Sequence, residues 1–217
     1  MRTLLTILMT MMMLLLTACG GGNAQTGADT SAPKETQTTA SARSDQRVLV
    51  VYFSRADENT GGVGYIEKGN TKILAEMIAE RTHGDLFEIK TVKPYPKEYR
   101  PATEAAKQEK EENARPEIVG DLPDLSKYDV VFLGYPIWWS DMPMLVYTFL
   151  DRENFAGKII LPFCTYEGSG LSGTDRTIAE TTKADVKDGF ALAGHIAQNS
   201  PDEARSALYE WMSKQGY

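Results

Sequence analysis

The chain has 217 residues, enough for one ordinary domain or at most two small ones. Its 30 acidic and 23 basic residues give a net charge of −7, which argues against a nucleic-acid binder, because such proteins carry a basic surface. Two cysteines exclude a disulfide scaffold and a cysteine-based zinc site, and two histidines leave little for histidine-rich metal or proton-relay chemistry.

The N-terminal end has the layout of a secretory signal. Arg2 precedes a largely apolar run at 4–16, which is shorter than the roughly 20 apolar residues that cross a bilayer. The run ends in Leu-Thr-Ala-Cys, which resembles a bacterial lipobox, where cleavage precedes the cysteine and that cysteine is lipidated. We therefore expect a signal peptide at 1–18, a lipid on Cys19 and export to the bacterial cell envelope; an ordinary signal peptide cleaved nearby is the alternative.

The segment after Cys19 predicts a tether. Residues 20–46 contain no valine, isoleucine, leucine or aromatic side chain, so they cannot bury enough apolar surface to offset the entropy of ordering. Together with the cysteine they form a disordered linker, 19–46, with a mean reach of about 30 Å. Residues 47–217 have a globular composition and carry the whole net charge, because the charges of Arg2 and the tether cancel.

Strand and helix patterns alternate from residue 47 onward. Continuous apolar runs predict strands buried on both faces at 48–53, 130–134 and 158–163, and alternating patterns predict weaker strands at 86–89 and 186–192. Helical patterns predict the helices between and after them, at 71–82, 96–113, 143–150, 171–182 and 201–214, with a clear apolar face at 71–82 and 201–214. The second of these helices is rich in charge, and we interpret it as a solvated face rather than a binding site.

This alternation predicts an α/β fold with a doubly wound, five-stranded parallel sheet. The three fully apolar strands belong in the centre and the two alternating strands at the edges, which gives the order 2-1-3-4-5. Ligands of such sheets bind outside the carboxyl ends of the strands, where the strand order reverses. The loops after the first, third and fourth strands therefore form the candidate site.

The loop after the first strand offers neutral hydrogen-bonding groups. Ser54 ends the strand, and Asn70 and Thr71 open the first helix after a long polar excursion. A helix start presents unpaired N–H groups and the positive end of the dipole, so this segment suits a phosphate. Plain helix capping is the alternative, since asparagine and threonine are favoured at helix starts anyway.

The loop after the third strand has two adjacent tryptophans, Trp138 and Trp139, between prolines. Neighbouring side chains of an extended loop point in opposite directions, so both rings can hardly enter one core. At least one ring is expected to form a platform for a planar ligand. A tryptophan that covers the hydrophobic core is the alternative.

The loop after the fourth strand, 163–170, combines an aromatic residue with small flexible ones. Glycines there let the backbone approach and hydrogen-bond to a ligand edge, although an ordinary turn between strand and helix explains the same composition. Cys164 has no plausible histidine partner in the sequence, and we interpret it as a buried thiol rather than a nucleophile. Together the three loops describe a phosphate-bearing planar ligand across the carboxyl edge of the sheet.

Residues 47–217 resemble the flavodoxin-like superfamily, and specifically the bacterial flavodoxin group with a YPIWW-type loop. The resemblance rests on four segments, which are VLVVYFS at 48–54, GNTK at 69–72, GYPIWW at 134–139 and PFCTYEGSG at 162–170. It implies the flavodoxin-like fold and noncovalent binding of FMN.

The resemblance also implies which residues hold the cofactor. The phosphate-binding loop of the family matches Ser54, Asn70 and Thr71. The loop that covers the isoalloxazine matches Pro136, Ile137 and Trp138, with Trp138 preferred over Trp139 as the stacking ring. The loop that borders the pyrimidine edge matches Thr165, Tyr166, Gly168 and Ser169.

The sequence departs from the family pattern in the phosphate loop. The strand-end serine usually runs directly into the Asn-Thr pair, whereas residues 55–69 intervene here. This insertion contains a rival motif, Asn59-Thr60-Gly61. We prefer Asn70-Thr71, because the helical periodicity begins directly after it. The glycine-rich part of the insertion, with Tyr65, either closes over the cofactor or moves freely.

The implied redox function leaves two main classes open. The first is a one-electron carrier that docks with protein partners through its acidic surface. The second is an NAD(P)H-dependent FMN or quinone reductase, which needs room over the flavin for a nicotinamide or a quinone. A lipoprotein that keeps the fold without a flavin is the third. In each case the membrane is contacted through the lipid anchor, and neither a metal nor a nucleic acid is expected.

Overall fold

The computed structural model describes residues 46–217. The predicted signal peptide at 1–18, the predicted lipidation site Cys19 and the predicted tether up to residue 45 lie outside the described residues. Within the described part, no helix is both long enough and apolar enough to cross a membrane.

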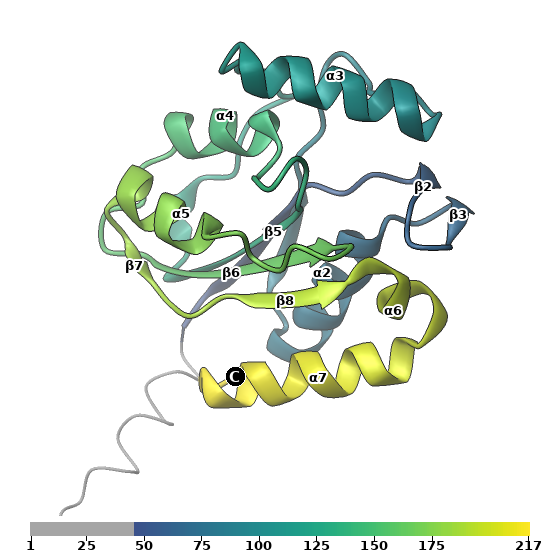
Figure 1. Cartoon of the computed structure of the whole chain (residues 1–217). Coiled ribbons are helices and arrows are strands. Elements are labelled where there is room, and N and C mark those ends of the chain that lie inside the picture. The colour runs from purple at the N-terminus through teal and green to yellow at the C-terminus, as the bar shows by residue number, and fades with distance from the viewer. Residues whose placement is uncertain (1–45) are drawn as a thin grey trace, which may run out of the picture. The chain divides into compact units, whose positions relative to one another are not determined.

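A parallel sheet forms the centre of the domain (Figure 1). Its strands are β1 (Val48–Tyr52), β4 (Asp85–Glu88), β5 (Val130–Pro136), β6 (Ile159–Tyr166), β7 (Asp185–Val186) and β8 (Phe190–Ala193). The order is β4-β1-β5-β6-β7, and β8 also pairs with β6. All these pairings are parallel. The predicted α/β class and the order 2-1-3-4-5 are confirmed, because the strands that are apolar throughout need cover on both faces and take the centre.

The fifth position of the sheet holds two short strands where the sequence predicts one strand at 186–192. β7 and β8 are separated at 187–189, where the Trp211 indole donates a hydrogen bond to the carbonyl of Asp188 at 3.0 Å. Gly189 lies so close to Leu171 that an added Cβ would come within 2.9 Å of it. The interruption therefore follows from contacts made by the neighbouring helix and loop, which strand periodicity does not report.

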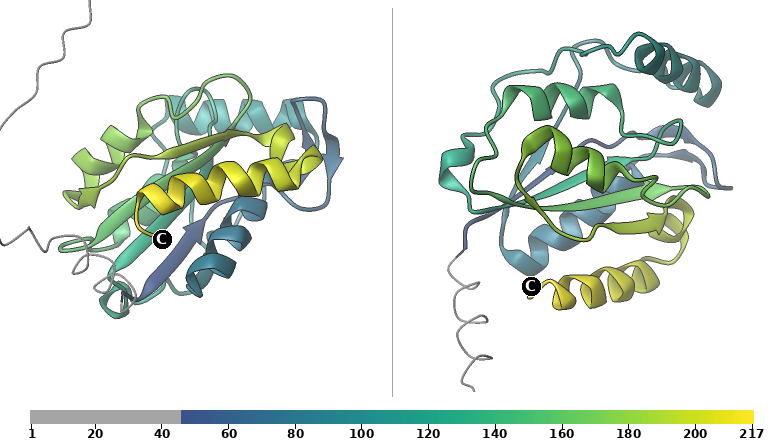
Figure 2. Two further views of the ribbon diagram at one scale, coloured as in Figure 1. Left: turned by 90° about the horizontal axis from the view of Figure 1, so that it is seen from below. Right: turned by 60° about the vertical axis from the view of Figure 1, so that its left-hand side comes forward.

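Helices cover both faces of the sheet (Figures 1 and 2). Their bounds are α2 (Asn70–Thr82), α3 (Tyr99–Glu111), α4 (Met144–Arg152), α5 (Thr174–Thr182), α6 (Gly194–Asn199) and α7 (Pro201–Lys214), with a 3-10 turn η1 (Leu125–Lys127). α2 and α7 pack on one face, and α4 and α5 pack on the other. The five helices predicted from the sequence are present with ends shifted by at most three residues. The short helix α6 is an addition.

The long excursion after β1 contains a β-hairpin that its polar sequence does not predict. Its strands β2 (Asp57–Asn59) and β3 (Gly64–Ile66) pair antiparallel, with Asp57 opposite Ile66. Three glycines at positive φ, at 61, 62 and 64, provide the turn. The hairpin stands at the carboxyl edge of the sheet, beside the helix α3 (Figure 1).

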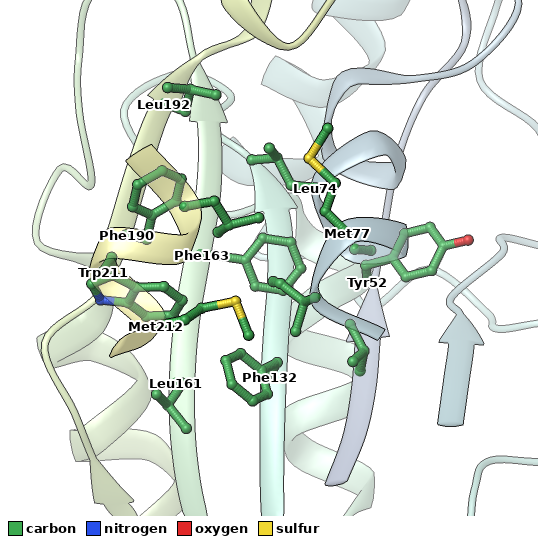
Figure 3. Packing of buried hydrophobic residues seen from close by; sticks show 14 of the residues in the cluster. Tyr52, Leu74, Met77, Phe132, Leu161, Phe163, Phe190, Leu192, Trp211 and Met212 are labelled. Carbon is green, nitrogen blue, oxygen red and sulfur yellow. The ribbon is translucent and has the colours of Figure 1, made fainter. Parts of the chain in front are cut away.

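The hydrophobic core on the α2 and α7 face is built around large rings from the central strands (Figure 3). Phe132 of β5 is fully buried and meets the edge of Trp211 at a centroid distance of 6.0 Å. Phe163 of β6 lies opposite Gly134 of β5, where an added Cβ would come within 2.2 Å of the phenyl ring. The glycine therefore gives Phe163 the space to lie flat against the neighbouring strand.

We predict that Gly134→Ala lowers the free energy of unfolding by about 1–3 kcal/mol, because overpacking a well-filled core costs that much. Urea unfolding of the single variants Gly134→Ala and Phe163→Leu and of the double variant measures the coupling. The smaller leucine should accommodate the new methyl, so the double variant should lose clearly less than the sum of the two single losses. Strictly additive losses would contradict the close contact.

Candidate functional site

A cavity of about 410 Å³ lies at the carboxyl edge of the sheet, where β5 and β6 end. Its walls are formed by Asn59, Thr60, Asn70, Tyr99, Thr103, Ala106, Pro136, Ile137, Trp138, Trp139, Ser140, Thr165, Tyr166, Glu167 and Ser169. This volume falls within the roughly 300–1,000 Å³ of sites that bind small molecules. The position is the one that the strand order predicts for a ligand.

The start of α2 is fixed to the sheet by side-chain hydroxyls. The backbone N–H of Lys72 donates to Ser54 Oγ at 3.0 Å, so Ser54 caps the helix from the end of β1. Thr71 is buried, and its hydroxyl shares a 2.8 Å hydrogen bond with the hydroxyl of Thr165 at the end of β6. The first residue of the helix, Asn70, lines the cavity. Of the three predicted phosphate-loop residues, Ser54 and Thr71 therefore hold the helix in place, and Asn70 reaches the cavity wall.

The hairpin β2–β3 brings the rival motif to the same cavity. Asn59 and Thr60 line the wall together with Asn70, although they are separated from it in sequence by the rest of the insertion. The Asn59 amide is directed at backbone carbonyls of its own loop, with distances of 3.3–3.5 Å. The two motifs that the sequence presents as alternatives thus contribute to one site.

The tryptophan loop is a tight turn with unusual backbone angles. Trp138 and Asp141 exchange backbone hydrogen bonds of 2.9 and 3.1 Å across the loop. The two residues between them, Trp139 and Ser140, have φ values of 52° and 58°. Positive φ at both positions is the geometry of a type I′ turn, which glycine and asparagine normally occupy. A tryptophan in this conformation carries backbone strain, which is found preferentially at functional sites.

The two tryptophan rings have different surroundings. Trp138 is half-buried and stands perpendicular to Phe53 and to Tyr95, with centroid distances of 5.3 and 5.0 Å. Trp139 is 48% exposed, and its indole N–H donates to the carbonyl of Thr103 at 2.8 Å. The Nζ of Lys107 lies 5.8 Å from the centre of the Trp139 ring. Trp138 is therefore a braced ring on the cavity wall, and Trp139 links the loop to α3.

The helix α3 forms a wall of the site. Tyr99, Thr103 and Ala106 lie on one helical face and line the cavity. Lys110 donates to the Trp139 carbonyl at 2.7 Å and pairs with Asp141 at 3.3 Å, which fastens the helix to the tryptophan loop. This corrects the interpretation of 96–113 as a solvated face. The signal in the sequence is the i, i+4, i+7 spacing of these three residues on an otherwise charged helix.

The other end of the α3 wall is fastened to the hairpin. The Glu58 carboxylate accepts the backbone N–H of Tyr99 at 2.7 Å and so caps the helix. Arg55 donates to the carbonyls of Glu58, Pro96 and Lys97. Burial lowers the pKa of this guanidinium from its ordinary high value. Its Nε is buried and has no hydrogen-bond partner among the described residues.

The loop after β6 contributes Thr165, Tyr166, Glu167 and Ser169 to the wall. Behind them, burial raises the pKa of the Cys164 thiol to about 12, and its Sγ lies 3.7 Å from the carbonyl of Gly170. A thiol that stays protonated is a poor nucleophile, which agrees with the interpretation of Cys164 as structural. Gly168 has a φ of 116° and lies outside the cavity wall.

Most of the predicted site residues meet at the cavity. Those that line it are Asn70, Pro136, Ile137, Trp138, Thr165, Tyr166 and Ser169. The predicted residues that do not line it are Ser54, Thr71 and Gly168. Sequence reasoning did not select Tyr99, Thr103, Ala106, Ser140 and Glu167, and it ranked Asn59, Thr60 and Trp139 second. The residues that it missed come mainly from α3, whose place over the site depends on tertiary contacts.

The composition of the wall limits what it binds. Aromatic and apolar side chains form one part, and hydroxyls and amides form another. Among the described residues that line the cavity, Glu167 is the one charged side chain. Such a wall suits a flat ligand that carries neutral hydrogen-bond acceptors, held by stacking and by neutral donors.

Solved structures with the same fold include several flavoproteins. A proposed flavoprotein from Bacteroides eggerthii DSM 20697 is 26% identical, with a TM-score of 0.60 over 78% of this chain and 97% of that chain. A second one, from Bacteroides uniformis ATCC 8492, is 25% identical, with a TM-score of 0.61 over 77% of this chain and 98% of that chain. A flavoprotein in complex with FMN from Lactobacillus acidophilus NCFM is 20% identical, with a TM-score of 0.53 over 70% of this chain and 97% of that chain.

No curated protein sequence matches the chain. The family model described as flavodoxin matches residues 47–214, which is nearly the whole of the folded part. The matched range thus spans all strands of the sheet and all three loops that meet at the cavity. The chain belongs to the flavodoxin family.

Proposed function

We propose that this domain binds FMN noncovalently and transfers electrons at the bacterial cell envelope. One observation carries the proposal: at the carboxyl edge of a flavodoxin-family sheet, a braced aromatic wall and a set of neutral hydrogen-bonding groups line the same cavity. The structural likeness to the Lactobacillus acidophilus flavoprotein, which is described in complex with FMN, supports this choice of cofactor.

The phosphate end of FMN fits the start of α2. Asn70 and Thr60 face the cavity there, and the first backbone N–H groups of a helix attract an anion. Gly69 lies against Ser54 and the Arg55 carbonyl, where an added Cβ would come within 2.2–2.5 Å of both. The groups that this end offers to a phosphate are therefore the helix start and the side chains of Asn70 and Thr60.

The isoalloxazine end fits the tryptophan loop. Phe53 and Tyr95 hold Trp138 edge-on, so its ring is fixed before a ligand arrives. One side of Trp139 is already associated with Lys107 and α3. We therefore assign stacking to Trp138, and we assign the contacts with the polar edge of the flavin to Thr165, Tyr166 and Ser169, which line the same cavity.

Bound FMN supplies one-electron and two-electron redox chemistry, and the protein positions it and controls its surroundings. Here the residues of the chain would hold the flavin between two loops and keep water from one side of it. The net charge of −7 belongs to the folded part, which favours a weak, salt-sensitive encounter with a basic redox partner. The lipobox-like sequence before Cys19 supports attachment of the domain to the envelope through a lipid.

A second candidate function is an NAD(P)H-dependent FMN or quinone reductase. The observation that favours it is the α3 wall, because Tyr99, 40% exposed, and Trp139, 48% exposed, stand at the cavity and offer aromatic surface to a further planar molecule. A carrier that docks with proteins needs no such surface beyond the flavin itself.

Flavin binding is tested directly with the purified protein. We expect a yellow protein that quenches the fluorescence of added FMN, and we expect Trp138→Ala to weaken binding by about 1–3 kcal/mol, the value for stacking on an aromatic side chain. Trp139→Ala is the matched control and should have the smaller effect. A colourless protein that leaves FMN fluorescence unchanged would refute the proposal, and a larger loss with Trp139→Ala would reverse the assignment of the rings.

The two redox classes are separated by adding NADH or NADPH to the flavin-loaded protein without oxygen. A carrier should keep its visible flavin absorbance, because it needs a protein partner to receive electrons, whereas dithionite should bleach it at once. Rapid bleaching by either nucleotide would establish the reductase and exclude the pure carrier. A Tyr99→Ala variant then tells whether α3 contributes to the nucleotide site.

The lipid anchor is tested by labelling growing bacterial cells with radioactive palmitate. The wild-type chain should incorporate label and fractionate with membranes, and Cys19→Ala should do neither. Cys164→Ala is the control, since that thiol is buried in the core, and it should label like the wild type. Equal label in wild type and Cys19→Ala would rule out lipidation at this residue.

A further inference from the structure

Three aromatic rings from separate parts of the chain meet beside the cavity. Phe53 follows β1, Tyr95 lies in the loop between β4 and α3, and Trp138 belongs to the tryptophan loop. The ring centroids of each pair lie 5.0–5.8 Å apart, and Trp138 stands at 89° to both other rings. Edge-to-face packing stabilises a pair of rings beyond the area that it buries. Phe53 and Tyr95 therefore set the plane of Trp138, which lines the cavity.

The two supporting rings are held in different ways. Phe53 is 4% exposed, and its backbone N–H donates to the carbonyl of Gly134 at 2.9 Å, so this ring belongs to the sheet edge. Tyr95 is half-buried, and its hydroxyl donates to Glu109 Oε2 at 2.7 Å. Burial, together with this hydrogen bond, raises the pKa of the Tyr95 hydroxyl far above its ordinary value, so the hydroxyl keeps the proton that it donates. The orientation of Tyr95 therefore depends on a carboxylate of α3.

Glu109 lies on α3 at a place where a charge is costly. The residue is half-buried, and burial raises the pKa of its carboxyl even though the Tyr95 hydroxyl and Lys93 act in the opposite direction. A polar pair in such surroundings contributes little to stability, because the cost of removing the charge from water offsets much of the hydrogen bond. A fixed direction for the Tyr95 ring, rather than a gain in stability, is what this pair provides.

The next residue of α3 holds the other half of the tryptophan loop. Lys110 donates to the carbonyl of Trp139 at 2.7 Å. Glu109 reaches the ring of Trp138 through Tyr95. Two consecutive residues of one helix thus act on the backbone of one tryptophan and on the ring of the other. The position of α3 and the orientation of the Trp138 ring are therefore linked.

We propose that Glu109 and Tyr95 are positioning residues of the flavin site, which together hold the Trp138 ring at one angle. The inference rests on the proposed function, in which Trp138 stacks on the flavin, and it identifies residues outside the cavity wall that act on the stacking ring. A ring that is held in place before the ligand arrives loses less freedom on binding. The pair therefore contributes to FMN affinity through Trp138, without touching the flavin itself.

The experiment compares affinity with stability. Flavin fluorescence gives the FMN dissociation constants, and urea unfolding gives the stabilities, of the full mature chain and its variants. Tyr95→Leu removes the ring and the hydroxyl, whereas the double variant Tyr95→Phe/Glu109→Leu keeps the ring and makes the pair apolar. The matched control is Tyr128→Phe, because Tyr128 donates to Asp85 Oδ2 at 2.7 Å just before β5, at the end of the sheet opposite the cavity.

Affinity and stability should change in different directions. Tyr95→Leu should weaken FMN binding by about tenfold and Tyr95→Phe/Glu109→Leu by about threefold, as expected for losing an aromatic pair or a hydrogen bond. The double variant should nevertheless unfold at the same or a higher urea concentration than the wild type, because exchanging both partners of a buried polar pair for apolar groups is neutral or stabilising. Tyr128→Phe should bind FMN like the wild type. Weaker binding by an equally stable protein cannot come from misfolding.

A double-mutant cycle shows whether the pair acts through the ring. In a Trp138→Ala background, Tyr95→Phe/Glu109→Leu should weaken FMN binding no further, because the ring that the pair orients is gone. An equal loss with and without Trp138 would mean that the pair only supports the position of α3, and it would refute the inference.

The ring is also observed without flavin, by fluorine NMR of protein labelled with fluorotryptophan. The chain has three tryptophans, and Trp138→Phe assigns the resonance of Trp138. That resonance should be single and sharp in the wild type and in Tyr128→Phe, and broadened or split in Tyr95→Leu and in Tyr95→Phe/Glu109→Leu. An identical Trp138 resonance in all four proteins would show that neither residue holds the ring, which overturns the inference.

The outcomes separate this inference from the proposed function. If the wild type binds FMN and both Tyr95 variants bind it equally well, the positioning role is refuted and FMN binding stands. If the wild type binds no FMN, the proposed function falls, and the positioning role falls with it. A loss of affinity confined to proteins that retain Trp138 supports both.

Discussion

The burial of β1, β5 and β6 on both faces is the constraint on which the rest of the structure depends. Strands that are apolar throughout need helices above and below, and parallel strands covered in this way end together at one edge. The loops that leave that edge carry the exposed ring of Trp139 and glycines at positive φ such as Gly61 and Gly168. The cavity between Asn70, Trp138 and Thr165 is the consequence.

At this edge, hydroxyl groups serve the scaffold more than the ligand. Ser54 caps α2, Thr71 pairs with Thr165, and the buried Tyr135 shares a 2.9 Å hydrogen bond with Thr174. These hydrogen bonds satisfy polar groups at the junctions between strands and helices, and they fix the loops relative to one another. A residue of a binding motif can therefore support the site by fixing the position of the backbone, while neighbouring residues of the motif contact the ligand.

The helix α3, which forms a wall of the site, is held in place by polar contacts rather than by burial of a large apolar face. α3 buries only two alanines, Ala102 and Ala106. Its place is set by Glu58 at one end and by Lys110 at the other, which fasten it to the hairpin and to the tryptophan loop. Links of this kind contribute less than apolar burial and are easily exchanged, so segments that rely on them belong to the less stable parts of a fold. The wall of the cavity is thus assembled on a rigid sheet edge by weaker contacts.

The sequence by itself determined the fold class, the strand order and the loops that form the site, because apolar periodicity reports which faces are buried. It also identified most of the cavity wall, including Trp138 and Thr165. Only the tertiary structure decided the break in the fifth strand, the joint use of Asn59 and Asn70, the role of α3 and the pairing of Glu167 with His195. Each of these depends on contacts between segments far apart in the chain, where hydrogen bonds and close packing, rather than local pattern, determine the geometry. Two histidines first suggested little chemistry, yet one of them stands beside Glu167, a charged side chain on the cavity wall.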